Sequence, residues 1–313
     1  MQQGIVHITT GSWYRVETAT GASFQCKIKG NFRIKGYKTT NPIAVGDVVD
    51  FEVLSDGKTG VITNIHERKN CIIRRSVNLS HQSHMIATNI DRAFLVTSLF
   101  QPRTPFGFID RFLVTAEAYF IPATIIFNKV DIYDDESFAL LDMARNMYTA
   151  IGYECRVVSA LRGDGVNELR EELIGQTVLF SGNSGVGKSA LINTLDPLLQ
   201  LKTADISGYH QKGKHTTTFA EMHRLARGGF IIDTPGIKEF GMVDFSKEEV
   251  ALFFPEMKAL LHQCKFSNCT HVHEPGCAVK TAVSEHHIHP QRYKSYLNIL
   301  SGREMEIEPW ELK

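Results

Sequence analysis

A strand, a glycine-rich loop and the start of a helix follow one another in Thr177-Val-Leu-Phe-Ser-Gly-Asn-Ser-Gly-Val-Gly-Lys-Ser-Ala-Leu-Ile-Asn193. The apolar run from Thr177 to Phe180 is of strand type, and the run from Ala190 to Leu195 is helical. Between them stands Gly182-x-x-x-x-Gly187-Lys188-Ser189, the phosphate-binding loop pattern. A structural glycine turn is the alternative interpretation, but both flanks favour a nucleotide site.

The loop offers three kinds of phosphate contact. Its glycines let backbone N–H groups point inward at phosphate oxygens, and the helix N-terminus adds partial positive charge. Lys188 can reach the β- and γ-phosphates, and the Ser189 hydroxyl can ligate Mg²⁺. The residues expected to contact the nucleotide here are Gly182, Asn183, Ser184, Gly185, Val186, Gly187, Lys188, Ser189 and Ala190.

A four-residue motif after another strand indicates which base is bound. The apolar run from Ala123 to Phe127 predicts a buried parallel strand, and Asn128-Lys129-Val130-Asp131 follows it directly. The carboxylate of Asp131 can accept hydrogen bonds from both N1–H and the 2-amino group of guanine, whereas adenine lacks that pair of donors. A polar turn at a strand end is the alternative, but the phosphate loop in the same chain favours a guanine site.

Other residues near the base are expected to support this recognition. Asn128 is expected to hold neighbouring loops, and the aliphatic stem of Lys129 is expected to cover the base. The stretch from Arg156 to Ser159 predicts a further strand. The backbone N–H groups of Ser159 and Ala160, at its end, are expected to meet guanine O6.

Two further segments match the switches that sense the γ-phosphate. Gly229 to Gly236 predicts a buried strand ending in Asp-x-x-Gly, with Asp233 near Mg²⁺ through water and the Gly236 N–H on the γ-phosphate. The polar segment Gly213-Lys-His-Thr-Thr-Thr-Phe219 lies between the phosphate loop and that strand. One of its threonines is expected to complete the Mg²⁺ shell: Thr217, with Thr216 and Thr218 as alternatives. An edge strand is the other interpretation of three threonines in a row.

The order of these motifs differs from that of an ordinary Ras-like GTPase. Base recognition at Asn128 comes before the phosphate loop at Gly182, whereas the ordinary order is the reverse. Alternating strands and helices predict a parallel sheet flanked by helices, and a circularly permuted chain can build the same sheet. The old termini then join through a helix from Val166 to Leu173. Other elements expected here are a strand over Ala93–Leu99 and helices over Ile109–Phe120 and Glu136–Ile151.

The N-terminal part predicts a different architecture. Short alternating runs separated by glycine turns indicate about five strands in the first 70 residues, which suits a small β-barrel of the oligonucleotide-binding (OB) type. The runs are Gly4–Thr9, Trp13–Glu17, Ser23–Lys29 and Asp47–Val53.

The outer face of this barrel is basic. Six basic residues stand against one acidic residue between Arg15 and Lys38. Alternation places Lys27 and Lys29 on the face opposite Phe24, Cys26 and Ile28, with Phe32 and Tyr37 nearby. Such a surface suits RNA backbone contacts and base stacking, and a solvated barrel face is the alternative.

The C-terminal segment carries a candidate metal site. Cys264-x-x-x-x-Cys269-x-His271-x-x-x-x-x-Cys277 offers three thiolates and one imidazole, the ligand set of a closed structural Zn²⁺ site. Unrelated free cysteines are the alternative, and His262 and His273 are rival ligands. Ser246-Lys-Glu-Glu249 reads as a capping box that opens a helix, and a last helix is expected from about Pro290 to Leu300.

Bulk composition fits a soluble globular protein with no membrane span or secretory signal, so a cytoplasmic location is expected. Lys+Arg and Asp+Glu are both 34, so net charge argues neither for nor against an RNA partner. The length of 313 residues allows two or three domains. The expected limits are 1–71 for the barrel, 72–244 for the permuted GTPase domain and 245–313 for a helical zinc-binding domain.

The N-terminal barrel, the permuted motif order and the Cys/His cluster occur together in one known family. In this combination the chain resembles the RsgA (YjeQ) family, the bacterial small-ribosomal-subunit biogenesis GTPases. The resemblance spans nearly the whole chain. It implies GTP hydrolysis during late maturation of the small subunit, binding of that subunit and its rRNA, stimulation by it, and release after hydrolysis. It implies GTP or GDP, Mg²⁺ and one structural Zn²⁺ as cofactors, and we expect a monomer without membrane contact.

The resemblance also indicates how water is placed. Ile237 follows Gly236, where Ras-like enzymes carry a water-orienting glutamine. His215 resembles the proposed catalytic histidine of the family, and a neutral imidazole can orient water or accept its proton. A loop histidine without that role is the alternative. Two other functions are alternatives: a signalling GTPase with a protein partner, and an RNA-binding scaffold with a structural nucleotide.

Overall fold

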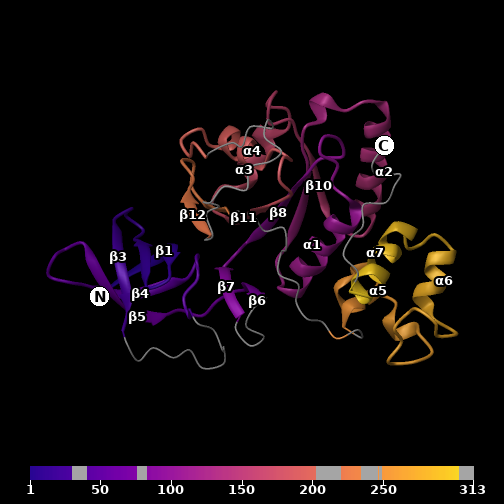
Figure 1. Ribbon diagram of the computed structural model, residues 1–313, viewed down its shortest axis with the longest axis horizontal. Helices are drawn as coiled ribbons and strands as arrows, with labels where there is room; N and C mark the ends of the chain where they lie inside the picture. Colours follow the sequence, from indigo (N-terminus) through magenta and orange to yellow (C-terminus); the bar gives the residue numbers. More distant parts are fainter. Residues whose placement is uncertain (30–40, 76–82, 202–219, 234–245, 247–248, 303–313) are drawn as a thin grey trace, which may run out of the picture.

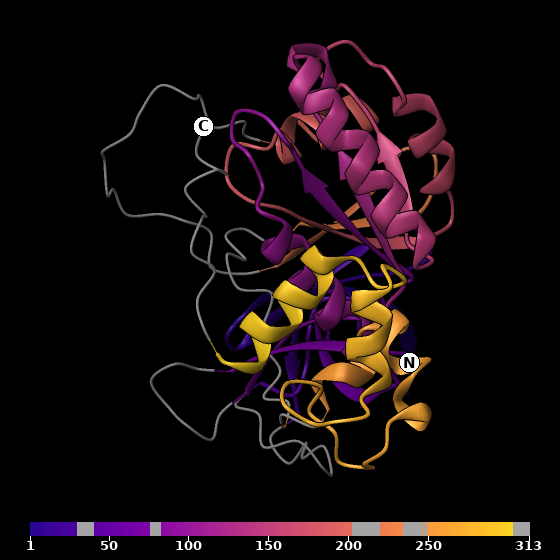
Figure 2. The ribbon, with the colours of Figure 1, turned by 90° about the vertical axis from the view of Figure 1, so that its right-hand side faces the viewer.

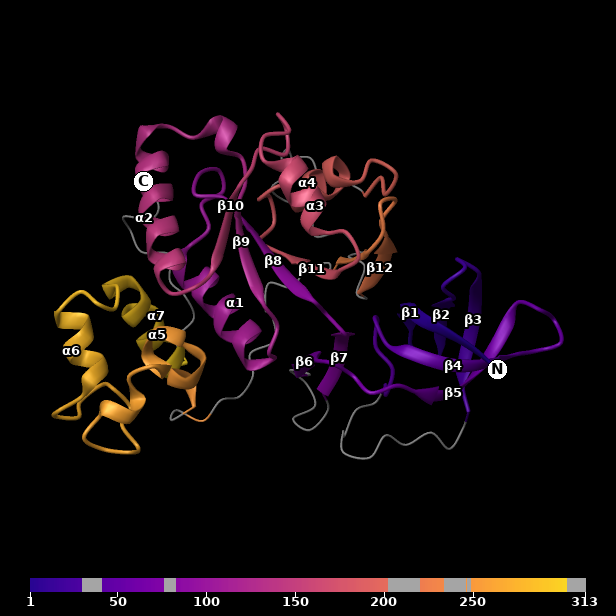
Figure 3. The ribbon, with the colours of Figure 1, turned by 180° about the vertical axis from the view of Figure 1, so that it is seen from behind.

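One eleven-stranded sheet contains strands from Gln2 to Asp233 in the computed structural model, which describes residues 1–29, 41–75, 83–201, 220–233, 246 and 249–302. The strand order is β10-β9-β8-β11-β13-β12-β1-β2-β3-β5-β4, and an additional pairing of β1 with β4 curls one end of the sheet into a barrel. Figures 1 and 3 show this barrel and the C-terminal helical domain at opposite ends of a central α/β domain.

The barrel consists of β1 (Gln2–Thr10), β2 (Trp13–Glu17), β3 (Ser23–Ile28), β4 (Val48–Val53) and β5 (Thr59–Ile65). It closes through antiparallel pairing of β1 with β4 and parallel pairing of β3 with β5. Alternation along each strand fills the interior with apolar side chains such as Val16, Cys26 and Phe51. The predicted five-stranded OB-type barrel is confirmed.

The central domain contains β8 (Arg92–Thr97), β9 (Ala123–Phe127), β10 (Glu154–Val157), β11 (Thr177–Ser181), β12 (Glu221–Arg224) and β13 (Phe230–Asp233). All are parallel to their neighbours except β12, which runs antiparallel to β13. Strands β8, β9, β11 and β13 are almost continuously apolar because both faces of the sheet are covered.

Two pairs of helices cover those faces. Helices α1 (Phe106–Ala118) and α2 (Asp135–Ala150) pack on one face, against residues such as Leu95 and Ile125. Helices α3 (Val166–Glu172) and α4 (Lys188–Leu195) pack on the other, against Phe94 and Phe180. Figure 1 shows α3 and α4 on one side of the strands and α1 on the other.

Most strand and helix predictions agree with these bounds to within a few residues. The strand predicted over Arg156–Ser159 is displaced and runs over Glu154–Val157. Elements for which no range was predicted include strands β5 and β12, helix α6 (Ala278–Ser284) and the ribbon formed by β6 (Cys71–Arg75) and β7 (Ser83–Thr88). Strand β12 pairs with β1, which is distant in the chain, and β6 and β7 pair across residues 76–82, so these pairings leave little trace in the local pattern.

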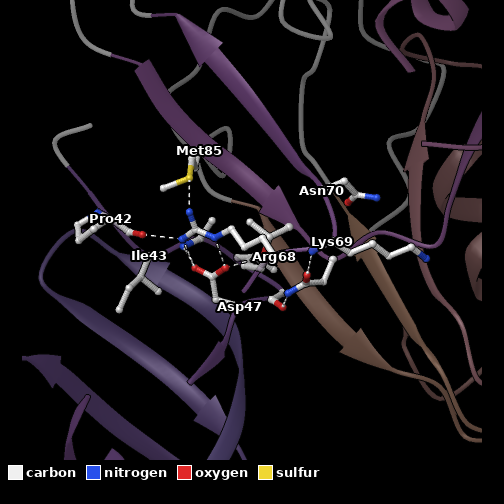
Figure 4. Close-up of polar contacts among 12 residues, drawn as sticks. Pro42, Ile43, Asp47, Arg68, Lys69, Asn70 and Met85 are labelled. Atoms are coloured by element: carbon white, nitrogen blue, oxygen red, sulfur yellow. Dashed lines mark hydrogen bonds and ion pairs between the residues drawn. The ribbon is translucent and has the colours of Figure 1, made fainter. Parts of the chain in front are cut away.

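A buried ion pair fastens the barrel to this ribbon. The Arg68 guanidinium donates from Nε and Nη2 to the two oxygens of Asp47, each at 2.7 Å, and Asp47 is fully buried. The same guanidinium donates to the Pro42 carbonyl and to Met85 Sδ, as Figure 4 shows. Asp47 also accepts from the Thr88 hydroxyl at 2.8 Å. The carboxylate is thus fully paired where the barrel meets β7.

The C-terminal domain consists of short helices: η2 (Val250–Phe253), α5 (Pro255–Lys258), η3 (Leu261–Gln263), α6 (Ala278–Ser284) and α7 (Pro290–Leu300). Figure 2 shows this domain in front of the barrel and below α2. Glu249 accepts from the backbone N–H and hydroxyl of Ser246, as in a capping box, but a 3₁₀ turn follows and not the predicted α-helix. No helix of the described residues is long and apolar enough to cross a membrane. The domain limits named above stay predictions.

Candidate nucleotide and metal sites

The predicted phosphate loop lies at the carboxyl end of β11, beside the ends of β8, β9 and β13, where open parallel sheets bind ligands. Its glycines are required by close contacts. At Gly182 (φ 152°) a Cβ would lie 2.3 Å from the Val96 carbonyl oxygen, and at Gly187 (φ 89°) it would lie 2.5 Å from Asn128 Nδ2. Any larger residue would push the loop away from its neighbours.

Lys188 begins α4 and makes an ion pair across the sheet edge. Its ammonium lies 2.7 Å from Asp233 Oδ1, at the end of β13. Both side chains are largely buried, so the pair has some protection from solvent screening. The residue predicted to bind phosphate and the residue predicted near Mg²⁺ therefore converge on one point.

Asn128 joins the base-recognition loop to the phosphate loop. Its buried side chain donates from Nδ2 to the Val186 carbonyl at 2.9 Å and accepts from the Ala160 N–H at 3.0 Å. Lys129 follows in a left-handed conformation (φ 67°), and its ammonium donates to the Gln101 carbonyl at 2.8 Å. Partial burial lowers the pKa of Lys129, although Asp131 opposes the shift. One amide thus couples three loops of the site.

Asp131 lies beside the Ser159-Ala160 turn. The Ser159 hydroxyl donates to Asp131 Oδ1 at 2.6 Å and accepts from the Arg162 N–H at 3.0 Å. The Ser159 N–H donates to the Asp164 carbonyl, and the Ala160 N–H donates to Asn128. These two N–H groups, predicted to meet guanine O6, have internal partners here, so that contact requires the turn to adjust.

Several predicted residues lie outside the described part of the chain: Thr216, Thr217 and Thr218, the candidate catalytic His215, and Gly236 with Ile237. The phosphate-loop residues Asn183, Ser184, Gly185, Ser189 and Ala190 lie where the motif predicts, between β11 and the first turn of α4.

The four predicted metal ligands come together in the C-terminal domain. The ligand atoms of Cys264, Cys269, His271 and Cys277 all lie within 4.8 Å of one another. His271 Nδ1 is 3.6 Å from Cys264 Sγ and 3.3 Å from Cys277 Sγ. Tetrahedral zinc with ordinary bond lengths places sulfur and nitrogen ligands about 3.5 Å apart, so the cluster fits zinc. Among the described residues, the rivals His262 and His273 are not in the cluster.

The surroundings of the cluster set the protonation of its ligands and hold the ligand loop in place. Burial, with further contributions from Cys277 and Cys264, raises the pKa of the Cys269 thiol to about 12. Burial lowers the pKa of His271, which favours the neutral, ligating imidazole. The ligand loop is held by Glu274, which accepts from the Thr270 hydroxyl, and by Tyr293, whose hydroxyl donates to the His271 carbonyl at 2.6 Å. A cation would allow the crowded thiols to ionise.

Comparison with known proteins gives one consistent family. The chain matches the RsgA N-terminal domain over residues 3–62 and the RsgA GTPase over residues 65–243. The small ribosomal subunit biogenesis GTPase RsgA of Bacteroides fragilis strain YCH46 is 54% identical over 302 residues, covering 96% of this chain and 97% of the relative. That of Christiangramia forsetii is 52% identical over 305 residues, 96% of each chain.

Two solved structures share the whole fold. The crystal structure of YjeQ from Thermotoga maritima has a TM-score of 0.79 and 33% identity, covering 96% of this chain and 98% of that one. YloQ, described as a circularly permuted GTPase, has a TM-score of 0.73 and 27% identity, covering 96% and 94%. The predicted permutation is confirmed.

Proposed function

The chain belongs to the RsgA family of small ribosomal subunit biogenesis GTPases, and we propose that it hydrolyses GTP on the maturing small subunit and leaves after hydrolysis. The observation that carries this proposal is the convergence of Lys188, Asp233 and the Asn128-coupled loops at one sheet edge. A nucleotide that only stabilises the fold needs no residue whose contacts change when the γ-phosphate binds or leaves. The Lys188–Asp233 pair is a contact that an arriving nucleotide must compete for, which favours a switch.

In the proposed mechanism Lys188 exchanges Asp233 for the β- and γ-phosphates. Backbone N–H groups between Gly182 and Gly187 bind the remaining phosphate oxygens. The residues that would hold Mg²⁺ are Ser189 and Thr217, with Asp233 acting through water. When bound, Mg²⁺ neutralises charge that develops on the phosphates. His215 orients the attacking water or accepts its proton.

Base selection rests on Asp131. One of its oxygens accepts from Ser159, which orients the carboxylate and leaves its other lone pairs for guanine. We expect Asp131→Asn to shift preference from guanine toward xanthine nucleotides, because an amide can donate where xanthine accepts. Competition binding with GDP and xanthosine diphosphate measures the shift. An unchanged preference for GDP would refute this assignment.

The barrel is the part we assign to ribosomal RNA. Lys27 Nζ lies 4.2 Å from the centroid of the Trp13 ring, and Trp13 is 38% exposed. Trp13, Arg15 and Lys27 lie on β2 and β3, the strands with which OB folds bind oligonucleotides. An exposed aromatic ring next to cationic groups suits a stacked base and its phosphates. We also propose that Cys264, Cys269, His271 and Cys277 hold one structural Zn²⁺, and that the protein acts as a cytoplasmic monomer.

GTP hydrolysis by the purified protein, alone and with purified small or large subunits at fixed salt, tests the proposal. We expect slow intrinsic turnover that small subunits raise strongly and large subunits do not. Turnover that is indifferent to subunits would remove the ribosome from the function and favour a signalling GTPase with a protein partner. If subunits do stimulate, His215→Ala tests whether the imidazole places water.

A further inference from the structure

The segment from Ser98 to Thr104, between β8 and α1, touches both halves of the nucleotide site without carrying a nucleotide motif. Its Gln101 carbonyl accepts from the Lys129 ammonium at 2.8 Å. Its Pro102 lies against the phosphate loop, where a Cβ at Gly185 would be 3.4 Å from the proline Cδ. One short loop therefore contacts the base-recognition motif on one side and the phosphate loop on the other.

This loop is closed upon itself by buried hydrogen bonds. The Thr104 N–H donates to the Ser98 carbonyl at 2.7 Å, and the Ser98 N–H donates to Thr104 Oγ1 at 3.2 Å. The Ser98 hydroxyl donates to the Phe100 carbonyl. Thr104 and Ser98 are both buried. These contacts shape the turn that presents the Gln101 carbonyl to Lys129.

Tyr133 ties this loop to the base-recognition motif. It follows the 3₁₀ turn η1 (Val130–Ile132), which contains Asp131. Its hydroxyl accepts from the Leu99 N–H at 2.7 Å, and its ring packs edge-on against Phe138. A path of contacts thus leads from Asp131 through Tyr133 and Leu99 to Gln101, and back to Lys129, two residues before Asp131.

We propose that the Ser98–Thr104 loop forms part of the guanine-nucleotide site, beside the base-recognition motif and the phosphate loop, and that Tyr133 is a positioning residue within this site. The inference rests on the proposed function of that site. Lys129 is a long, flexible side chain, and covering the base requires its stem to hold one conformation. The Gln101 carbonyl fixes the ammonium end, and Tyr133 fixes the loop that carries this carbonyl. Without the Tyr133 hydroxyl, the loop and Lys129 become ordered only when the nucleotide binds. The free energy that this ordering costs lowers the affinity for the nucleotide.

Tyr133→Phe removes only the hydroxyl that accepts from Leu99, and Tyr153→Phe is its matched control. The two tyrosines are 9% and 7% exposed, and the Tyr153 hydroxyl is hydrogen-bonded to Glu117 at 3.0 Å, in a contact that involves neither the Ser98–Thr104 loop nor the nucleotide motifs. We expect the dissociation constant of a fluorescent GDP analogue to rise about tenfold in Tyr133→Phe, the effect of one lost buried hydrogen bond, and to stay unchanged in Tyr153→Phe. The midpoint temperature of thermal unfolding should fall by a similar amount in both variants. A difference in GDP affinity between them then reports positioning and not stability.

A second pair of variants covers the case in which Tyr133→Phe fails to fold. Thr104→Val removes the acceptor of the Ser98 N–H, and Thr115→Val removes an equally buried hydroxyl whose partner is the Arg111 carbonyl within α1. Only Thr104→Val is expected to weaken GDP binding. Equal GDP affinity within each pair would overturn the inference.

A double-mutant cycle tests whether Tyr133 acts through Lys129. If it does, Tyr133→Phe costs little in a Lys129→Met background, so the two losses of GDP affinity do not add. Fully additive losses would overturn the path proposed here. The proposed function fails separately, because it requires the wild-type protein to bind and hydrolyse GTP, whereas the inference concerns only the ratio between variants.

Discussion

The barrel and the C-terminal domain are joined to the GTPase domain in two different ways. The barrel is joined by main chain: β1 pairs antiparallel with β12, with Ile8 opposite Glu221, so both belong to one sheet. Ion pairs of Arg15 with Glu221 and of Arg224 with Glu17 flank this seam. The joint is therefore spread over backbone hydrogen bonds and several side chains.

The C-terminal domain is joined by side chains, and among the described residues it contains no strand. Its centre is Arg292 on α7, which is 1% exposed. The guanidinium pairs with Asp110 on α1 at 2.6 Å and with Glu256 on α5 at 2.7 Å, and it stacks over Phe254. Asp110 is fully buried and also accepts from the Tyr148 hydroxyl. One arginine therefore compensates two buried carboxylates.

The two joints also lead to different parts of the nucleotide site. Strand β12 precedes β13, which ends in Asp233, the partner of Lys188. Helix α1 follows the Ser98–Thr104 loop, which contacts the phosphate loop and Lys129. The barrel is thus attached next to Asp233, and the C-terminal domain next to the Ser98–Thr104 loop. The barrel joint should therefore tolerate the loss of one side chain, whereas the C-terminal joint depends on the side chain of Arg292.

Loss of the metal should have the largest effect, and it should be confined to the C-terminal domain. We expect Cys269→Ala to abolish binding of the proposed zinc and to unfold that domain, because binding of a structural zinc contributes about 10 kcal/mol or more to folding. Metal analysis and hydrogen exchange measure both outcomes. Cys155→Ala, in a half-buried cysteine outside the cluster, should keep its zinc. One zinc per chain in Cys269→Ala would refute the ligand set.

The substitution Arg292→Met should have the second-largest effect. It leaves Asp110 and Glu256 without their cation, and breaking a buried pair in this way costs about 3–5 kcal/mol. Urea unfolding gives the loss of free energy. Arg227→Met is the control, because Arg227 is exposed and its pair with Glu171 should contribute less than about 1 kcal/mol. Equal losses in the two variants would show that the C-terminal joint does not depend on Arg292.

The barrel seam should respond to pH through His7. Its buried ring packs edge-on against Phe230 and faces Glu17, Arg15 and Arg224. Burial lowers the pKa of His7 below its ordinary value of 6.5, although Glu17 opposes the shift. As pH falls, the unfolded chain is therefore protonated first. The contribution of His7 to stability is complete above pH 6.5 and is lost as pH falls from there toward its folded pKa.

His7→Phe keeps an aromatic ring on Phe230 and removes the titration. We expect the difference in unfolding free energy between wild type and His7→Phe to change with pH by no more than about 1.4 kcal/mol per unit in that window. Parallel pH profiles for the two proteins would contradict the lowered pKa.

The smallest effect should come from the Arg15–Glu221 pair. The atoms are 3.1 Å apart, but both side chains are about one third exposed, so breaking the pair should cost about 0.2–1 kcal/mol. Arg15→Glu should be destabilising, and the charge-reversed double variant Arg15→Glu/Glu221→Arg should recover most of that loss in urea unfolding. Failure to recover would mean that this pair contributes nothing to the seam.

Local sequence alone determined much of this protein. The apolar run Ala123–Phe127 predicted β9 with the bounds observed, because a buried parallel strand is apolar along its whole length. The last helix, expected from about Pro290 to Leu300, also has those bounds. The phosphate loop and the cluster of Cys264, Cys269, His271 and Cys277 could be recognised because one short segment supplies all the atoms of each.

Only the tertiary structure decided which distant partners meet. Pairs such as Lys188 with Asp233 and Arg292 with Asp110 join residues far apart in sequence, and no local pattern specifies them. The seam between β1 and β12 and the Gln101 carbonyl beside Lys129 depend on backbone atoms, which every residue type carries. The motifs therefore predicted the chemistry, while chain closure in three dimensions set how the domains are joined and which carbonyl holds the Lys129 ammonium.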